Sequence, residues 1–129
     1  MTKVLLTAMV LIVSQIAFSS EIDSLLLRAR VSCGNESYSE AIKMYELYIK
    51  KSKVENLKNV YIEMANCYFF QNKKTTAIKY IKEAISKYGF TEEDFIYNSV
   101  LNENLSSFAL SVVYDDYFEL RKKYLASIN

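Results

Sequence analysis

Two short acidic groups in the C-terminal third of the chain are the side chains best suited to acid–base chemistry. Glu92, Glu93 and Asp94 follow one another, and Asp115 and Asp116 form a second group. Neighbouring carboxylates can share protons or bind calcium. Acidic residues are also common at helix N-termini, where their carboxylates accept hydrogen bonds from free backbone amides and complement the helix dipole. We therefore interpret both groups as helix starts.

Other kinds of catalytic site lack the residue types that they need. The chain has no histidine, which excludes Ser-His and Cys-His nucleophile pairs and histidine-based metal sites. Its two glycines, Gly34 and Gly89, are too far apart in sequence to form a phosphate-binding loop. The sequence thus predicts no enzyme activity, no metal and no cofactor.

The elements that position these residues are predicted to be helices. Proline is absent and glycine occurs twice, whereas turn-rich all-β folds need more of both. Apolar residues at helical spacing predict an all-α fold with a hairpin over 22–51, a hairpin over 57–88 and a cap over 91–128. The expected hairpin helices are Ile22–Cys33, Tyr38–Lys51, Leu57–Gln71 and Thr75–Tyr88. The first hairpin should turn at Gly34 to Ser37, and Gly89 should end the second in a left-handed conformation.

The C-terminal cap is expected to cover the open end of the stacked hairpins. Thr91 and the acid three residues later have the pattern of a capping box, which opens a helix extending through Asn102. Residues 105–113 are predicted to be a short apolar helix or an extended segment. The last helix should start at Asp115 or Asp116.

The two hairpins are internal repeats of one another. They superpose without gaps at a shift of 36 residues, which matches Ala29 with Ala65 and Ala41 with Ala77. The second unit carries a bulky, small and aromatic pattern at Tyr61, Met64, Ala65, Tyr68, Ala77, Ile81 and Ala84, followed by Gly89. This pattern resembles the tetratricopeptide repeat. The resemblance implies stacked hairpins whose first helices line a groove for another protein or a peptide.

Carried over position by position, the resemblance implies which residues face that groove. They lie on the first helix of each unit: Arg30, Asn59, Ile62, Asn66, Phe69 and Phe70, beside Leu26 and Cys33. Ile62, Phe69 and Phe70 would make apolar contacts, and the polar residues would add selectivity. Adjacent aromatics cannot both face one core, so either Phe69 or Phe70 is an exposed anchor, or the C-terminal segment covers both.

The two cysteines, Cys33 and Cys67, raise the question of a disulfide. Neighbouring units stack first helix on first helix, so the pair could meet across the interface. Against this, the shift of 36 sets Cys33 opposite Phe69, which predicts that the two thiols face different directions. Buried free thiols are therefore favoured over a bridge, which has strict geometry.

Residues 1–19 have the pattern of a cleaved signal peptide. Lys3 precedes an uncharged stretch from Val4 to Phe18, and Ala17 and Ser19 occupy the positions that a signal peptidase reads. This stretch is shorter than the ~20 residues that span a bilayer. We expect an exported protein, periplasmic or secreted, with a single mature domain over 20–129.

The charge balance bears on the class of partner. Removing Lys3 from the 16 basic residues leaves 15, equal to the 15 acidic residues, so no basic excess points to nucleic acid or anionic lipid. The sequence predicts an exported scaffold or adaptor that binds a protein or peptide without catalysis. The alternative is a small inhibitor or immunity-type protein that neutralises an envelope-acting toxin. Partner identity and oligomeric state stay open.

Overall fold

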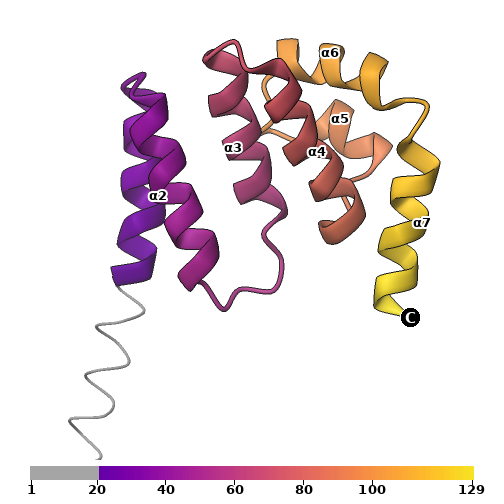
Figure 1. Cartoon of the computed structure of the whole chain (residues 1–129), viewed down its shortest axis with the longest axis horizontal. Coiled ribbons are helices and arrows are strands. Elements are labelled where there is room, and N and C mark those ends of the chain that lie inside the picture. The colour runs from indigo at the N-terminus through magenta and orange to yellow at the C-terminus, as the bar shows by residue number, and fades with distance from the viewer. Residues whose placement is uncertain (1–20) are drawn as a thin grey trace, which may run out of the picture.

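The computed structural model describes residues 21–129, which form helices and short connections without a strand (Figure 1). Residues 21–34 are helical. The helices that follow are α2 (Tyr38–Lys51), α3 (Lys58–Phe70), α4 (Lys74–Tyr88), α5 (Glu92–Tyr97), α6 (Glu103–Val113) and α7 (Tyr117–Ile128). The predicted all-α fold is confirmed. The predicted signal peptide, residues 1–19, lies outside the described residues. Within 21–129, no helix has the length and apolar character needed to cross a membrane.

The helices form a row of hairpins. The helix of residues 21–34 and α2 make the first hairpin, and α3 and α4 make the second beside it (Figure 1). α3 packs against both α2 and α4. The C-terminal helices follow on the other side, where α7 packs along α4, and α6 contacts both α4 and α5. The C-terminal segment therefore covers the second hairpin, as the sequence predicted.

The turns of the two hairpins have the same backbone geometry. Glu36 and Asn72 adopt left-handed conformations, with φ of 64° and 61°. In each turn, the next amide, that of Ser37 or Lys73, donates to the carbonyl five residues earlier, which is the hydrogen bond of a Schellman motif. The two turns lie 36 residues apart, as in the sequence superposition. The predicted turn start at Gly34 was wrong, because Gly34 is still helical and Glu36 reverses the chain.

Small residues let the hairpin helices approach closely. Ala29 and Ala65, matched by the shift of 36, are fully buried, and so are Ala41 and Ala77. Close-packed interiors tolerate extra volume poorly, so a larger side chain at one of these positions would destabilise the fold by about 1–3 kcal/mol. Larger side chains fill the remaining space: Tyr45, Phe90, Ile62, Met64, Ile81, Ile85, Leu105 and Val113 are fully buried.

The C-terminal segment differs from its prediction at one boundary. The capping box of Thr91 and Asp94 is present, but α5 ends at Tyr97 and does not continue through Asn102. Asn98 is extended, and the side chain of Asn102 accepts from the amides of Asn104 and Leu105. Asn102 therefore caps a new helix, α6, which settles residues 105–113 as helical. The last helix begins after Asp116, as expected.

Gly89 ends α4 and is also the point where Tyr124 and Arg121 of α7 pack against the second hairpin. Its φ is 73°, the predicted left-handed conformation. A Cβ atom built on Gly89 would lie 2.6 Å from the ring of Tyr124, so a side chain at this position would have to displace the ring. Arg121 Nη1 donates to the Gly89 carbonyl at 3.2 Å. One residue thus fixes both a helix end and the docking of α7.

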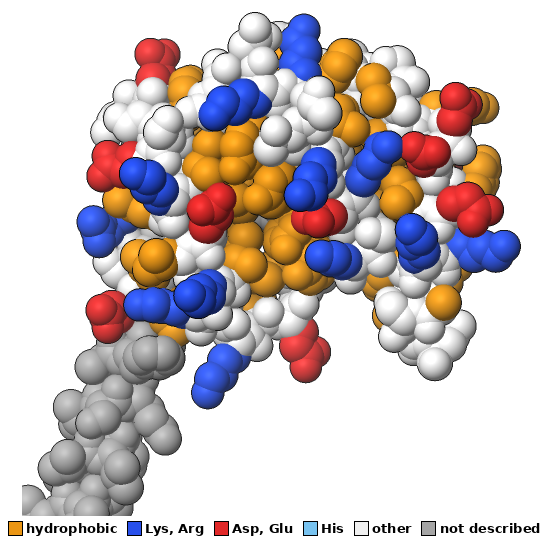
Figure 2. Space-filling view, viewed as in Figure 1, with side chains coloured by type: hydrophobic (Ala, Val, Ile, Leu, Met, Phe, Trp, Pro, Cys, Tyr) orange, Lys and Arg blue, Asp and Glu red, His pale blue; other side chains and the backbone are white. Residues whose placement is uncertain are grey.

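The surface shows no region of a single charge sign on the face in view. Figure 2 shows hydrophobic side chains gathered across the middle of this face, with basic and acidic side chains interspersed around them. This distribution agrees with the near-neutral balance of the sequence.

Candidate functional site

A groove between the helix of residues 21–34 and α3 brings together four of the residues assigned to the ligand-facing side. We call it the first-helix groove. Its volume is about 330 Å³. Its lining residues are Arg30, Cys33, Gly34, Tyr45, Glu63, Asn66, Phe70 and Val100. The four that sequence reasoning assigned to this side are Arg30, Cys33, Asn66 and Phe70.

An ion pair spans the groove. Arg30 Nε donates to Glu63 Oε1 at 2.8 Å, with the Arg30 side chain 50% exposed and that of Glu63 14% exposed. Such a half-exposed pair contributes about 1 kcal/mol or less to stability. A guanidinium carries five N–H donors, so the contact through Nε leaves Arg30 further donor capacity toward a ligand.

Of the two adjacent aromatics, Phe70 faces solvent. Phe70 is 45% exposed, whereas Phe69 is partly buried and packs against the core. The ring of Phe70 lies 5.4 Å from that of Tyr38, centroid to centroid, and 6.2 Å from that of Phe69. The three rings form a supported apolar surface at the end of the groove, and such a surface suits an aromatic or aliphatic ligand side chain.

Asn66 lines the groove but already binds its own chain. Its Nδ2 donates to the Val100 carbonyl at 2.8 Å, and its Oδ1 accepts from the Asn102 amide at 3.0 Å. Both polar atoms of the side chain are therefore used to hold the connection between α5 and α6 against α3. The sequence assigned Asn66 to ligand selectivity, and the geometry gives it a structural role.

Ile62 was wrongly assigned to ligand contact. It is fully buried in the core and exposes no surface to a ligand. Ile62 and Asn66 lie one helical turn apart on the same face of α3, and Asn66 binds the α5–α6 connection. The C-terminal segment thus covers this part of the face, which the repeat pattern left open. Asn59 is exposed but lies outside the groove lining.

Sequence reasoning missed Glu63, Tyr45 and Val100. Of these three, only Glu63 could have been noticed in the sequence, because it is the only acidic residue in α3. Tyr45 belongs to α2, and its approach to the groove depends on how the helices stack. Val100 comes from the α5–α6 connection, whose position no local pattern indicates.

The two cysteines meet across the same interface. Cys33 Sγ and Cys67 Sγ lie 2.9 Å apart, with both present as thiols. The prediction that they face different directions was therefore wrong. That prediction used the 36-residue shift that superposes equivalent residues of the two hairpins. Helices that pack against each other are also staggered along their axes. This stagger brings Cys33 to a residue 34 positions away and not 36.

The pKa values of the two thiols diverge. The hydrogen bond from Cys67 lowers the pKa of Cys33, although burial and the nearby Glu63 carboxylate oppose this. The same hydrogen bond, then burial, raises the pKa of Cys67. Burial raises the pKa of Tyr45, and the charges of Glu63 and the cysteines raise it further. Cys33 is thus the thiol that ionises first, and it is the more exposed of the two.

The same sequence separation recurs along the array. Arg30 and Glu63 are 33 residues apart, and Asn66 and Val100 are 34 apart. Lys58 Nζ contacts Asp94 Oδ2 at 3.4 Å over a separation of 36. The contacts that join the helix of residues 21–34 to α3, and α3 to the α5 region, therefore connect residues about one repeat length apart.

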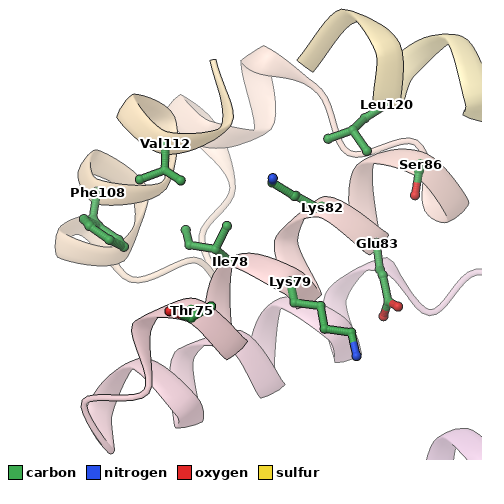
Figure 3. Close-up of a pocket in the computed structure, with 9 residues that line it drawn as sticks. All are labelled: Thr75, Ile78, Lys79, Lys82, Glu83, Ser86, Phe108, Val112 and Leu120. Atoms are coloured by element: carbon green, nitrogen blue, oxygen red, sulfur yellow. The ribbon is translucent and has the colours of Figure 1, made fainter. Parts of the chain in front are cut away.

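A second hollow lies between α4, α6 and α7 (Figure 3). Its volume is about 470 Å³. Ile78, Phe108 and Leu120 contribute apolar surface from the three helices, and Lys82 Nζ contacts Asp116 Oδ2 at 2.8 Å. No residue of this hollow was predicted as a site, because its walls come from segments that the repeat pattern does not relate. The ion pair of Lys82 with Asp116 joins α4 to the start of α7, as expected where one helix packs on another.

The acidic groups occupy helix starts. Glu92, Glu93 and Asp94 form the first turn of α5, and Asp116 precedes α7. Across residues 21–129, no group of three or more His, Cys, Asp or Glu side chains is arranged to hold a metal ion.

Comparisons with known proteins give no relative for this chain: no protein-family model, curated protein or solved structure matches it. The resemblance to the tetratricopeptide repeat therefore stays a prediction from the sequence pattern.

Proposed function

We propose that this protein is an exported binding module of the tetratricopeptide type that holds a peptide segment of another protein in its first-helix groove. In this proposal the protein acts as a scaffold or adaptor and catalyses no reaction. The observation that carries the proposal is the convergence of Arg30, Cys33, Asn66 and Phe70, predicted from the repeat pattern, on one groove.

The chemistry of the groove supports a peptide as its ligand. At one end, Phe70 packs against Tyr38 and keeps 45% of its surface exposed, which suits a large apolar anchor side chain. At the other, Arg30 is half-exposed and can donate to a carbonyl or carboxylate. An extended or helical segment offers both groups in one short stretch.

The arrangement of the helices supports the same proposal. Stacked helical hairpins bury one face against each neighbour and leave a continuous surface along the first helices. In this chain Ile62 is fully buried, and the C-terminal segment binds both polar atoms of Asn66. The open part of the surface is thereby limited to the seam between residues 21–34 and α3, which suits a short ligand segment.

A peptide selection tests the proposal. A library of random peptides is selected on the immobilised protein, and a selected peptide is titrated into isotope-labelled protein while backbone amide resonances are recorded. We expect the largest shifts at Arg30, Glu63 and Phe70, with α7 unaffected. Shifts confined to the hollow between α4, α6 and α7, or a selection that enriches no peptide, would contradict the proposal.

A further inference from the structure

The sulfur atoms of Cys33 and Cys67 lie close enough to form a disulfide bond with little movement. The two sulfur atoms lie 2.9 Å apart, and a disulfide bond is about 2.05 Å long, so closing the bond needs little movement. The cysteines come from separate hairpins, 34 residues apart in sequence. A bond between them would therefore join two elements of the fold across their interface.

The two thiols differ in access. Cys33 is partly exposed and lines the first-helix groove, whereas Cys67 is fully buried within α3. A reagent that enters the groove reaches Cys33 first, and Cys67 can react only with a sulfur already held at Cys33. This is the asymmetry of an attacking thiol and a resolving thiol.

We propose that Cys33 and Cys67 form a reversible intramolecular disulfide, made by exchange with a small-molecule or protein disulfide that enters through the first-helix groove. The Cys33 thiolate attacks one sulfur of the incoming disulfide and releases its other half as a thiolate. The Cys67 thiolate then attacks Cys33 Sγ and releases the second half. The two cysteines lose two electrons and two protons, and the incoming disulfide is reduced to two thiols.

The bond would hold the helix of residues 21–34 on α3. Arg30 and Glu63 already join these elements one turn away from the cysteines, at 2.8 Å. Oxidation would add a covalent link at the floor of the groove and fix the spacing of its two walls. This chemistry does not depend on whether the groove binds a peptide.

Oxidised glutathione is the probe that tests the proposal. The full chain is equilibrated with mixtures of reduced and oxidised glutathione, quenched with acid, alkylated in denaturant and weighed by mass spectrometry. We expect wild type to lose the mass of two hydrogen atoms and to bind no alkylating agent. The equilibrium should favour the disulfide roughly a hundredfold more in the folded chain than in urea, because folding already holds the sulfurs together.

Single variants separate the two roles. Cys67→Ser should stop at a mixed disulfide between Cys33 and glutathione, whereas Cys33→Ser should leave Cys67 unmodified while the chain is folded. The comparison of wild type in buffer and in urea keeps the test valid even if a serine variant folds poorly. Two alkylated cysteines in oxidised wild type, disulfides between chains, or equal equilibria in buffer and in urea would overturn the proposal.

Discussion

The second hairpin is joined to its two neighbours by different kinds of contact. On the N-terminal side, side chain meets side chain: Arg30 contacts Glu63, and Cys33 contacts Cys67. On the C-terminal side, the ion pairs of Lys58 with Asp94 and of Lys82 with Asp116 are accompanied by hydrogen bonds from side chains to backbone. Asn66 binds the Val100 carbonyl and the Asn102 amide, and Arg121 binds the Gly89 carbonyl.

This difference indicates that the interface of the second hairpin with the C-terminal helices is fixed, whereas its interface with the first hairpin is adaptable. Backbone groups that are removed from water must find partners, so side chains that bind them hold a segment in one register. Paired side chains can rotate, exchange partners or react. The C-terminal seam therefore suits a permanent cap, and the N-terminal seam suits a site that accepts a ligand.

The largest loss of stability is expected from Gly89→Ala. Alanine is strained at a φ of 73°, and its Cβ would meet the ring of Tyr124 at 2.6 Å. We expect the free energy of unfolding to fall by about 2–4 kcal/mol, from backbone strain and overpacking together. Chemical denaturation of the purified variant measures this fall.

Gly34→Ala is the matched control for this variant. No atom lies within 4 Å of a Cβ at Gly34, and the residue is helical, so alanine should be neutral or stabilise by about 0.5–1 kcal/mol. If Gly34→Ala and Gly89→Ala lowered the free energy of unfolding equally, the contact of α7 with Gly89 would not contribute to stability.

A smaller loss is expected from Asn66→Ala. The substitution removes both hydrogen bonds to the α5–α6 connection and leaves the Val100 carbonyl and the Asn102 amide without their side-chain partner. We expect about 1–3 kcal/mol of lost stability. Hydrogen exchange should also quicken in α5 and α6 before it does in α2.

Asn59→Ala serves as its control on the same helix. Asn59 is exposed, and its removal should change stability by less than about 0.5 kcal/mol. If Asn66→Ala behaves like Asn59→Ala, the C-terminal seam is not held by Asn66, and a ligand-binding role for this side chain returns to consideration.

The smallest effect is a gain, expected from Glu36→Gly. Glu36 holds a φ of 64°, a conformation that is strained for glutamate and easy for glycine. Relief of this strain should raise the free energy of unfolding by about 0.5–1 kcal/mol. Asn72→Gly, at the equivalent turn, should gain less because asparagine tolerates this conformation better. Thermal melts of the two variants, in which the gains are compared, check the prediction.

Spacing within each helix made much of the fold predictable. The buried alanines, the left-handed Gly89 and the Thr91 capping box were all predicted from patterns among residues a few positions apart. The left-handed residues of the two turns, Glu36 and Asn72, also lie 36 residues apart, the shift that superposes the two hairpins.

The arrangement between helices was less predictable. How far one helix is staggered along another decides which side chains meet, and a single sequence does not record this stagger. The contact of Cys33 with Cys67, and not the predicted separation, is the clearest case. Ile62 and Asn66 illustrate the same point, because the segment that covers them lies outside the repeat pattern.

The central claim is that the first-helix groove binds a peptide through Phe70. The most direct test is the dissociation constant of a selected peptide for Phe70→Ala and for Phe118→Ala, measured by calorimetry. Phe118 is the matched control, an aromatic of α7 that is 74% exposed and lies outside the groove. We predict that Phe70→Ala weakens binding at least about tenfold, as loss of an aromatic anchor does, and that Phe118→Ala leaves it unchanged. Equal affinities of wild type and Phe70→Ala, or a loss confined to Phe118→Ala, would contradict the claim.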